Sequence, residues 1–471
     1  MSDKFVAIQI GAASFIDEGT DKVLDILADR GGVNQLFLAT PTWTRGTGGR
    51  QLPGHPIPDH GVQEYDLDWI GGNYATVHPE YYGNTVLGSI GRAPEHPEYD
   101  MLEDVIPKAK ERGMGSYAWI EESNYSQALR DYPNFPKILE VDLWGRPTLH
   151  TCFNNPDYRN WHLSIVEDYA KSYDLDGIAW CSERPGPLNL AIQKPVEAGE
   201  LGCFCTHCQQ LGRNLGVNVE RAREGMEAVL AWNNKTSSGE KDPDGAFTSF
   251  WRILLRYPEV LAWQNLWTSS QRQMYADIYG VAKASNQDLQ VGWHVYHNIS
   301  FSPFYRADQD YAELAKVSDF LKVVIYNNCA GPRFFTWVTQ ICRTLFADAT
   351  PAEVYPLMLK LLNLDEGEFS DLSQIGFSAD YVRRETARAK AGVEGTETKI
   401  YSGIDIDIPV GMKEEYDLTS GDNLTRCSPD GVRDAVTAAF SGGADGVVLS
   451  RKYSEMFLDN LSGAGDAVRK L

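Results

Sequence analysis

The sequence predicts a single (β/α)8 barrel over residues 1–471 with long insertions in its βα-loops, and three observations favour that fold. Short apolar segments alternate with amphipathic segments along the whole chain, as parallel strands alternate with the helices that cover them. Eight of the apolar segments have the length of a strand, and eight strands close such a barrel. The pairs Asp176-Gly177 and Asp445-Gly446 place a glycine where a helix must turn into a strand. The alternative, an open doubly wound sheet, would normally show a Gly-rich phosphate turn after its first strand, which this sequence lacks.

The expected strands are spaced so that helices and loops fit between them. In order, they are Phe5–Ile10, Asn34–Ala39, Gly115–Ile120, Gly177–Cys181, Leu289–Tyr296, Phe320–Tyr326, Lys399–Ile408 and Gly446–Leu449. Helices are expected at Asp21–Arg30, Met101–Arg112, Asp157–Tyr173, Phe247–Ser285 and Pro429–Phe440. Three segments are too long for simple connections: an irregular loop at 41–100 after strand two, a segment at 184–246 after strand four, and a helical segment at 329–397 after strand six. No separate C-terminal domain is expected.

Charge and composition exclude some classes of partner. The chain has 43 Lys and Arg against 65 Asp and Glu, a net charge of −22, whereas nucleic acid and anionic membrane surfaces bind clustered positive charge. The first residues enter a strand without a basic and then apolar leader, and no apolar run of 18 residues occurs. We therefore expect a cytoplasmic protein with no nucleic-acid or membrane partner, which is free to form a homo-oligomer.

Three of the eight cysteines lie within six residues, Cys203-Phe-Cys205-Thr-His-Cys208, and this spacing is typical of a metal site and not of a disulfide framework. A structural zinc ion needs four ligands, so one more must come from His207 or from another part of the chain. Cys152 follows the third barrel unit and is expected on the same face of the barrel as the loop after strand four. It is therefore a candidate for the fourth ligand.

The stretch around these cysteines resembles a known family. Asp142-Leu-Trp-Gly145-Arg146 precedes Cys152-Phe-Asn-Asn155-Pro156-Asp-Tyr158-Arg159, and both precede the Asp176-Gly177 strand and the cysteine cluster. Over about residues 139–210 this order is similar to the zinc-containing β-galactosidases of glycoside hydrolase family 42, and closer still to a large group of glycoside-hydrolase-like (β/α)8 proteins. The resemblance implies that Cys152, Cys203, Cys205 and Cys208 bind a structural zinc ion, which would fasten the 184–246 insertion without taking part in chemistry.

The resemblance also implies a reaction. Glycoside hydrolysis uses two carboxyl groups beside the sugar, about 5–5.5 Å apart for retention of configuration and farther apart for inversion. The family places its acid/base residue just after strand four. In this sequence, Glu183 is the only acidic residue at that strand end. Alternation along Gly177–Glu183 puts Glu183 and Cys181 on the inward face. The family has a glutamate nucleophile at the end of strand seven, where this chain has Asp405 and Asp407 instead.

Alternation turns both of these aspartates inward, since Ile404, Ile406 and Ile408 share the other face of the strand. Two inward carboxylates are costly to bury unless they are paired or hydrated, so we expect Asp405 and Asp407 to belong to a site. The alternative is that they cap loops or pair with arginine. Which aspartate acts, and whether the reaction retains or inverts configuration, stays open.

Polar and aromatic side chains recur at the other strand ends, where chemistry takes place in (β/α)8 enzymes. Aromatic faces pack on the C–H surfaces of sugars and polar groups bind the hydroxyls, so we expect these residues to bind substrate. The candidates are Trp43, Trp119, Glu121, His294, Tyr296, Asn298, Tyr326, Asn328, Arg451 and Lys452. Taken singly, Trp119 also fits the core, and His294 also fits a hydrogen-bonded histidine inside the barrel.

Arginines near the strand ends raise a separate question. Arg45, Arg50, Arg184, Arg333 and Arg451 could bind a carboxylate on the substrate, as in a uronic acid. In so acidic a protein, ion pairs with neighbouring Asp and Glu are the favoured interpretation.

Three functions fit this pattern. A glycoside hydrolase would use Glu183 as general acid/base and Asp405 or Asp407 as its partner, and burial would have to raise the pKa of Glu183 toward about 6–7 for acid catalysis near neutral pH. A metal-dependent sugar isomerase, epimerase or lyase would hold a second divalent cation on Glu121, Glu183, His294 and Asp405. A non-catalytic carbohydrate-binding barrel would have lost the strand-seven glutamate. We expect the hydrolase, acting on a small glycoside or oligosaccharide, without a second metal.

Overall fold

Eight parallel strands close into one barrel. The computed structural model describes residues 4–43, 48–51, 57–122, 132–407 and 427–471. Around the barrel the strands follow the order β1, β2, β5, β8, β9, β10, β11, β12, and β12 pairs back onto β1. Their bounds are β1 Phe5–Gly11, β2 Gln35–Ala39, β5 Gly115–Glu121, β8 Gly177–Cys181, β9 Gln290–Val295, β10 Phe320–Val324, β11 Lys399–Asp405 and β12 Gly446–Ser450. The predicted (β/α)8 fold is therefore confirmed.

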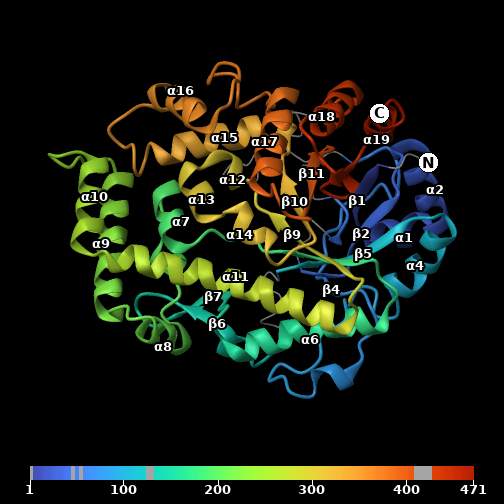
Figure 1. Ribbon diagram of the computed structural model, residues 1–471, viewed down its shortest axis with the longest axis horizontal. Coiled ribbons are helices and arrows are strands. Elements are labelled where there is room, and N and C mark those ends of the chain that lie inside the picture. Colours follow the sequence, from blue (N-terminus) through green and yellow to red (C-terminus); the bar gives the residue numbers. More distant parts are fainter. Residues whose placement is uncertain (1–3, 44–47, 52–56, 123–131, 408–426) are drawn as a thin grey trace.

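Helices connect and cover the strands (Figure 1). In chain order they are α1 Ala12–Glu18, α2 Thr20–Gly31, α4 Met101–Glu111, α6 Pro156–Ser172, α7 Pro187–Gln193, α8 Thr206–Asn214, α9 Val219–Ser237, α10 Ala246–Arg256, α11 Glu259–Ser285, α12 Asn298–Phe301, α13 Pro303–Asp308, α14 Tyr311–Ala315, α15 Asn327–Ile341, α16 Pro351–Leu362, α17 Ala379–Gly392, α18 Pro429–Ser441 and α19 Leu458–Val468. The long helix α11 lies beside α6, while α9 and α10 lie at the edge of the molecule away from the barrel. Among the described residues, no helix has the length and apolar character needed to cross a membrane.

The core has two parts, because side chains alternate along each strand. The barrel interior holds Ala7, Phe37, Tyr117, Trp119, Ala179, Cys181, Phe320, Tyr401 and Val448. On β8, Ile178 and Trp180 belong instead to the core between strands and helices. The inward face that alternation predicts for strand four is thus confirmed as far as Cys181.

Two predicted elements are wrong in their extent. The helix expected at Phe247–Ser285 is two helices, α10 and α11, because Pro258 cannot continue α10. The seventh strand ends at Asp405, before the predicted Ile408, because Asp407 has a positive φ of 54° and leaves the extended conformation. Ile408 itself lies outside the described residues.

Two small antiparallel sheets lie outside the barrel sheet. Strands β3 (Pro41–Thr42) and β4 (Gly72–Asn73) pair within the segment expected to be an irregular loop. Strands β6 (Leu139–Val141) and β7 (Pro147–Thr151) form a hairpin before α6. This hairpin lies next to the cysteine loop, where the amide of Phe204 donates to the carbonyl of Val141 at 2.7 Å.

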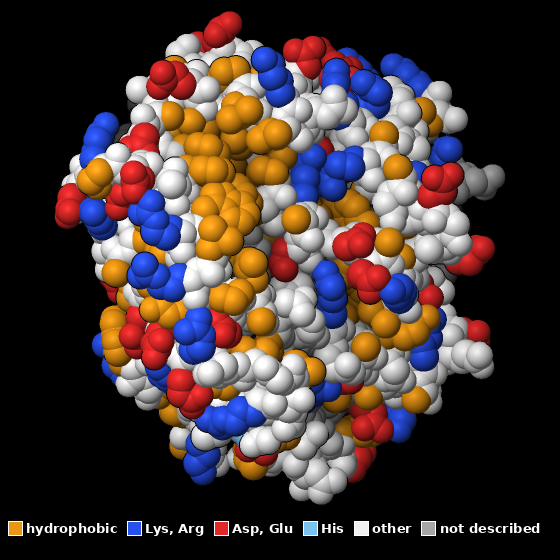
Figure 2. Space-filling view, turned by 60° about the vertical axis from the view of Figure 1, so that its left-hand side comes forward, with side chains coloured by type: hydrophobic (Ala, Val, Ile, Leu, Met, Phe, Trp, Pro, Cys, Tyr) orange, Lys and Arg blue, Asp and Glu red, His pale blue; other side chains and the backbone are white. Residues whose placement is uncertain are grey.

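One face of the molecule exposes large hydrophobic side chains. Seen from the side of α9 and α10, hydrophobic atoms form a broad area beside mixed acidic and basic side chains (Figure 2). On α10, Phe247, Trp251 and Leu255 are exposed at helical spacing, and Leu357 and Leu361 are exposed on α16. The expected capacity for homo-oligomers stays a prediction.

Candidate active site

A cavity of about 730 Å³ lies beside the carboxyl ends of β8, β9 and β10. Its walls come from the segment after β8, from α7 and α15, and from α11. Residues lining it include Glu183, Trp267, Tyr296, Phe301, Arg333 and Trp337. A cavity of this size with aromatic walls and a few charged groups is typical of a small-molecule site.

Glu183 reaches this cavity from the end of β8. Its side chain is 44% exposed, and its Oε1 lies 2.6 Å from Nε2 of His294, which is buried on β9. Behind the imidazole, Lys322 on β10 places Nζ 3.2 Å from His294 Nδ1. The ionised Glu183 carboxylate only accepts, so the ring proton sits on Nε2 and Nδ1 accepts from Lys322. His294 therefore donates to Glu183, and the two residues face each other as a neutral imidazole and a carboxylate.

The charges around Glu183 keep it ionised. Burial opposes its negative charge, but His294, Arg333 and Lys322 outweigh burial, so the pKa of Glu183 lies below its usual value. The pKa of Glu183 is thus lowered in the structure, whereas acid catalysis by the free protein would require a raised pKa. Burial and the neighbouring Lys322 also lower the pKa of His294, which keeps the imidazole neutral.

Lys322 itself is held inside the barrel by three acceptors. Besides His294, its Nζ donates to Gln9 Oε1 at 3.2 Å and to the hydroxyl of Tyr326 at 2.5 Å. The lysine is 2% exposed, and burial lowers its pKa to about 7. Gly403 on β11 leaves room for this arrangement, since a Cβ there would lie 3.0 Å from both Lys322 Cε and the Tyr326 ring. Gln9, Lys322 and Tyr326 therefore form a fixed polar layer beneath Glu183.

Asp405 is buried at the end of β11 and binds the start of α15. Its Oδ1 accepts from the amide of Asn328 at 3.1 Å, and its Oδ2 accepts from the amide of Cys329 at 2.8 Å. Unpaired amides at a helix start favour an anion. Burial nevertheless dominates and raises the pKa of Asp405 to about 6, although these amides and Arg333 favour the charged form. Asp405 does not line the described cavity.

Asp407 binds the start of another helix. Its carboxylate accepts from the amide of Phe457 at 2.9 Å and from Nδ2 of Asn460 at 2.7 and 2.9 Å. Phe457 is the residue immediately before α19, and Asn460 lies in the first turn of this helix. The left-handed backbone of Asp407 turns its side chain toward that helix, and Asp407 does not line the described cavity either.

The other expected substrate-binding residues divide by location. Tyr296 lines the cavity, and His294 and Tyr326 belong to the chain of contacts behind Glu183. Trp43 packs against α6, and Trp119 lies inside the barrel; each is 3% exposed. These two tryptophans are core residues in this structure.

Three candidates lie on other parts of the barrel rim. Glu121 accepts from the hydroxyl of Thr42 at 2.9 Å. Arg451 pairs with Glu455, and Lys452 is buried with its Nζ 2.7 Å from the carbonyl of Gly49, where burial lowers its pKa to about 8. None of the three lines the described cavity. Asn298 begins α12, and Asn328 contacts Asp405 through its backbone.

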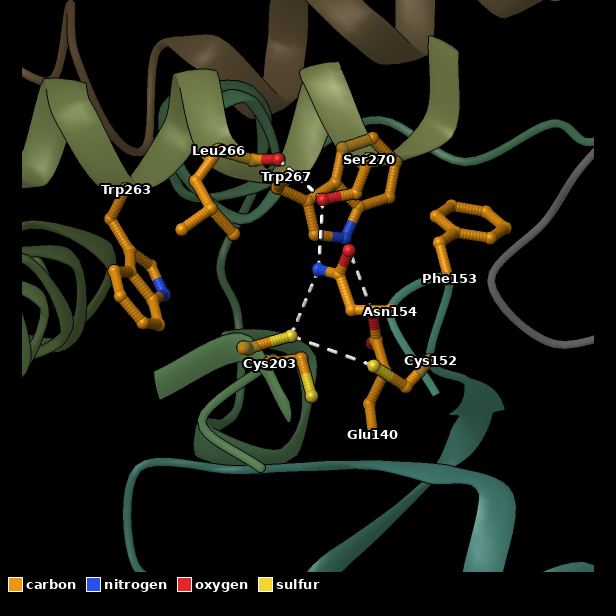
Figure 3. A pocket seen from close by; sticks show the side chains of 10 residues that line it. Glu140, Cys152, Phe153, Asn154, Cys203, Trp263, Leu266, Trp267 and Ser270 are labelled. Atoms are coloured by element: carbon orange, nitrogen blue, oxygen red, sulfur yellow. Dashed lines mark hydrogen bonds between the residues drawn. The ribbon is translucent and has the colours of Figure 1, made fainter. Parts of the chain in front are cut away.

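The four cysteines Cys152, Cys203, Cys205 and Cys208 form one buried cluster, with all four sulfur atoms within 4.8 Å of one another. His207 is not part of this group. In Figure 3, Cys152 and Cys203 lie below helix α11, from which Trp263, Leu266, Trp267 and Ser270 project toward them. The cluster joins the segment before α6 to the loop before α8, which are far apart in sequence.

The geometry of the cluster fits a metal ion. Cys152 Sγ lies 3.5 Å from the sulfurs of Cys205 and Cys208, and a zinc tetrahedron with bonds of about 2.3 Å has sulfurs about 3.8 Å apart. Amide groups donate to the sulfurs, among them Val141 N to Cys203 at 3.4 Å and Asn154 Nδ2 to Cys208 at 3.3 Å. Hydrogen bonds from the three other thiols lower the pKa of Cys205. The cluster could thus hold a metal ion.

The cysteine cluster and the cavity share a wall. Glu140 on β6 lies beside the cluster and also lines the cavity. Its carboxylate accepts from Arg184 Nη2 at 3.1 Å and from Trp267 Nε1 at 3.1 Å. Arg184 also pairs with Glu122 at 3.1 Å. Since Arg184 follows Glu183 directly, the hairpin held by the cysteines helps to fix the end of β8.

Sequence reasoning did not single out Lys322 or Cys181, which lie beside Glu183 and His294. The sulfur of Cys181 and the nearest ligand atoms of Glu183 and His294 lie within 4.8 Å of one another. A signal for Lys322 was present, because alternation in Phe320–Val324 turns this lysine inward with two apolar residues. A lysine on the inward face of a buried strand needs partners and so marks a polar site.

Comparison with known proteins reveals similarity of fold. No protein-family model matches the chain, and no curated protein matches its sequence. The β-galactosidase of the Antarctic haloarchaeon Halorubrum lacusprofundi superposes with a TM-score of 0.51 at 15% identity, over 98% of this chain and 57% of that chain. The β-galactosidase of the psychrophilic Marinomonas ef1 gives 0.53 at 10% identity, over 99% and 59%. The β-galactosidase of Bacillus circulans sp. alkalophilus gives 0.50 at 14% identity, over 99% and 56%.

The chain therefore has the barrel fold of these β-galactosidases, as the resemblance over residues 139–210 predicts. It spans somewhat more than half the length of each of the three structures.

Proposed function

We propose that the protein is a glycoside hydrolase with Glu183 as its reactive carboxyl group. The observation that carries the proposal is the position of Glu183, which follows the fourth barrel strand, reaches the cavity and accepts a hydrogen bond from His294. Structures of the same fold whose names give them as β-galactosidases support the reaction class. Trp267, Tyr296 and Trp337 offer aromatic faces to the rings of a small glycoside or oligosaccharide.

Hydrolysis needs one carboxyl group that protonates the leaving oxygen and a second that acts as nucleophile or base. We assign the first role to Glu183 and the second to Asp405, because Asp405 binds the start of α15, the helix whose Arg333 lines the cavity. Substrate binding would expel water and raise the pKa of Glu183, so that it gains its proton in the complex. Asp405 would exchange one of its backbone hydrogen bonds for a contact with the sugar.

The cysteine cluster is proposed to hold a structural zinc ion. Cys152, Cys203, Cys205 and Cys208 would complete its coordination and leave no position open for substrate, so the ion would fasten the loop before α8 to the segment before α6. Its effect on the reaction would be indirect, through the contact of Glu140 with Arg184.

Turnover of a panel of aryl α- and β-glycosides tests the proposal. Glu183→Gln removes the proton donor and keeps the shape, so turnover should fall by about 10²–10⁴-fold. The control Glu220→Gln, on the exposed surface of α9, should keep wild-type rates. A folded Glu183→Gln protein with wild-type turnover would overturn the assignment.

One observation favours a second function, a metal-dependent sugar isomerase, epimerase or lyase. Cys181, Glu183 and His294 bring three ligand types together beside the cavity. The ammonium of Lys322, which donates to His294, opposes a divalent ion there, and this favours the hydrolase. Chelation distinguishes the two, because EDTA would abolish turnover only in the metal-dependent enzyme, apart from slow loss of the structural ion.

A further inference from the structure

We propose that the substrate carries an anionic group, a carboxylate, sulfate or phosphate, which Arg333 binds beside Glu183. This inference rests on the proposed hydrolase and names the class of its substrate. The arginines near the strand ends are expected to form ion pairs in an acidic protein. Arg50 pairs with Asp17, Arg184 with Glu122 and Glu140, and Arg451 with Glu455. Arg45 lies outside the described residues.

Among these strand-end arginines Arg333 is the exception, because it forms no ion pair with any described residue. Its one polar contact within the part of the chain that the structure describes joins Nη1 to Nδ1 of His297, at 3.2 Å. Burial and neighbouring cations hold the pKa of His297 well below its usual value, so this partner is neutral. The remaining N–H groups of a guanidinium that lines the cavity are therefore free of any carboxylate contact in the described residues.

Helix α15 presents Arg333 to the cavity and holds it there. Arg333, Thr336, Trp337 and Gln340 line the cavity at spacings of three, four and seven residues, which is one face of a helix. Asp405 binds the amides at the start of this helix. The arginine thus sits on a rigid element, and a guanidinium so placed can bind two oxygens of a carboxylate, sulfate or phosphate with two parallel hydrogen bonds.

A second free cation lies farther out on the same wall. Arg343 lines the cavity just beyond α15, is exposed and forms no ion pair within the described ranges. At a helical rise of about 1.5 Å per residue, ten residues place Arg343 about 15 Å from Arg333 along the wall that α15 forms. The other cations of the lining are paired, Arg184 with Glu140 and Lys194 with Glu200.

Charge balance supports an anionic group at this position. A protein with a net charge of −22 repels anions in general, so two arginines that form no ion pair with any described residue in a cavity of about 730 Å³ indicate a local requirement. Arg333 is also one of the cations that stabilise the Glu183 carboxylate. An anion bound to Arg333 would neutralise that influence and help Glu183 to take up the proton that it donates. Substrate charge and catalysis would thus be coupled through one guanidinium.

Matched substrates test the inference. Aryl glucuronides and galacturonides are compared with the corresponding glucosides and galactosides in both anomeric forms, and 6-sulfated and 6-phosphorylated aryl glycosides distinguish the three anions. We expect a charged substrate to be preferred in kcat/KM. Arg333→Gln should lower the ratio of kcat/KM on the charged substrate to kcat/KM on its neutral partner about 30-fold or more. Arg252→Gln, an exposed arginine on α10, is the matched control and should leave the preference unchanged.

Binding is measured in parallel, by calorimetric titration with D-glucuronate, D-galacturonate, D-glucose and D-galactose. If no glycoside is turned over but the uronates bind in preference to the neutral sugars, and Arg333→Gln abolishes this preference, the anion site stands and the hydrolase proposal fails. If neutral glycosides are hydrolysed as well as charged ones, or Arg333→Gln leaves the ratio unchanged, the inference is overturned while the hydrolase stands. Absence of charge preference in both turnover and binding also overturns it.

Discussion

Replacing Lys322 with methionine should raise the pKa of Glu183, because it removes a positive charge fixed behind His294. The contacts of 2.6 Å and 3.2 Å on the two sides of the imidazole place Lys322 Nζ within about 8 Å of the Glu183 carboxylate. At an effective dielectric constant of about 20, this separation gives an attraction of about 2 kcal/mol between the two charges. Methionine has a similar length and no charge, so the barrel interior should stay packed.

The pKa is measured without any substrate, by titrating protein labelled with [5-¹³C]glutamate and assigning the Glu183 signal as the one lost in Glu183→Gln. The signal should titrate at a higher pH in Lys322→Met than in wild type, because the mutation removes one of the charges that favour the ionised form. Lys316→Met, which removes an exposed lysine on the surface, is the control and should leave the Glu183 titration unchanged. If Lys322→Met is folded and Glu183 titrates as in wild type, the contacts from Lys322 through His294 to Glu183 do not set the charge of Glu183.

Four further outcomes follow from the contacts. Cys208→Ser should lower the bound metal, measured by elemental analysis, from about one ion per chain to near zero, and should lower the melting temperature; full metal content would contradict the four-cysteine site. Arg184→Met should reduce the free energy of unfolding in urea by about 3–5 kcal/mol, because it leaves the buried carboxylate of Glu140 without its ion-pair partner. A loss below about 1 kcal/mol would refute that role of Arg184. Asp407→Val should cost about 1–3 kcal/mol, because a β-branched residue is strained at positive φ, yet folded protein should keep its specific activity. The rate should rise through pH 6 as Asp405 ionises, and a profile flat from pH 4 to 8 would exclude Asp405 as the ionised partner.

Features with a strict period could be predicted from the sequence. Alternation in Gly177–Cys181 gave the inward face of β8, because a strand has no other way to distribute its side chains. The spacing of Cys203, Cys205 and Cys208 placed three thiols in one loop, and the resemblance supplied Cys152. The barrel could be predicted from the number of apolar segments, because eight strands that alternate with helices close into a (β/α)8 barrel.

Features that depend on where the chain leaves a strand could not be predicted in the same way. Alternation put Asp405 and Asp407 on the inward face, but helix starts with unpaired amides compete for such carboxylates, and those starts come from α15 and α19, far away in sequence. The absence of an ion pair between Arg333 and any described residue is likewise a property of its surroundings, because a sequence lists charges but not their partners. Tertiary contacts therefore decide the electrostatics of the site.

The most direct test of the central claim, that Glu183 is the reactive carboxyl group, is chemical rescue of Glu183→Ala. With an activated aryl glycoside that the wild type hydrolyses, Glu183→Ala should be nearly inactive, and sodium azide should restore turnover with a glycosyl azide as the product. Wild-type hydrolysis by folded Glu183→Ala in the absence of azide would contradict the claim.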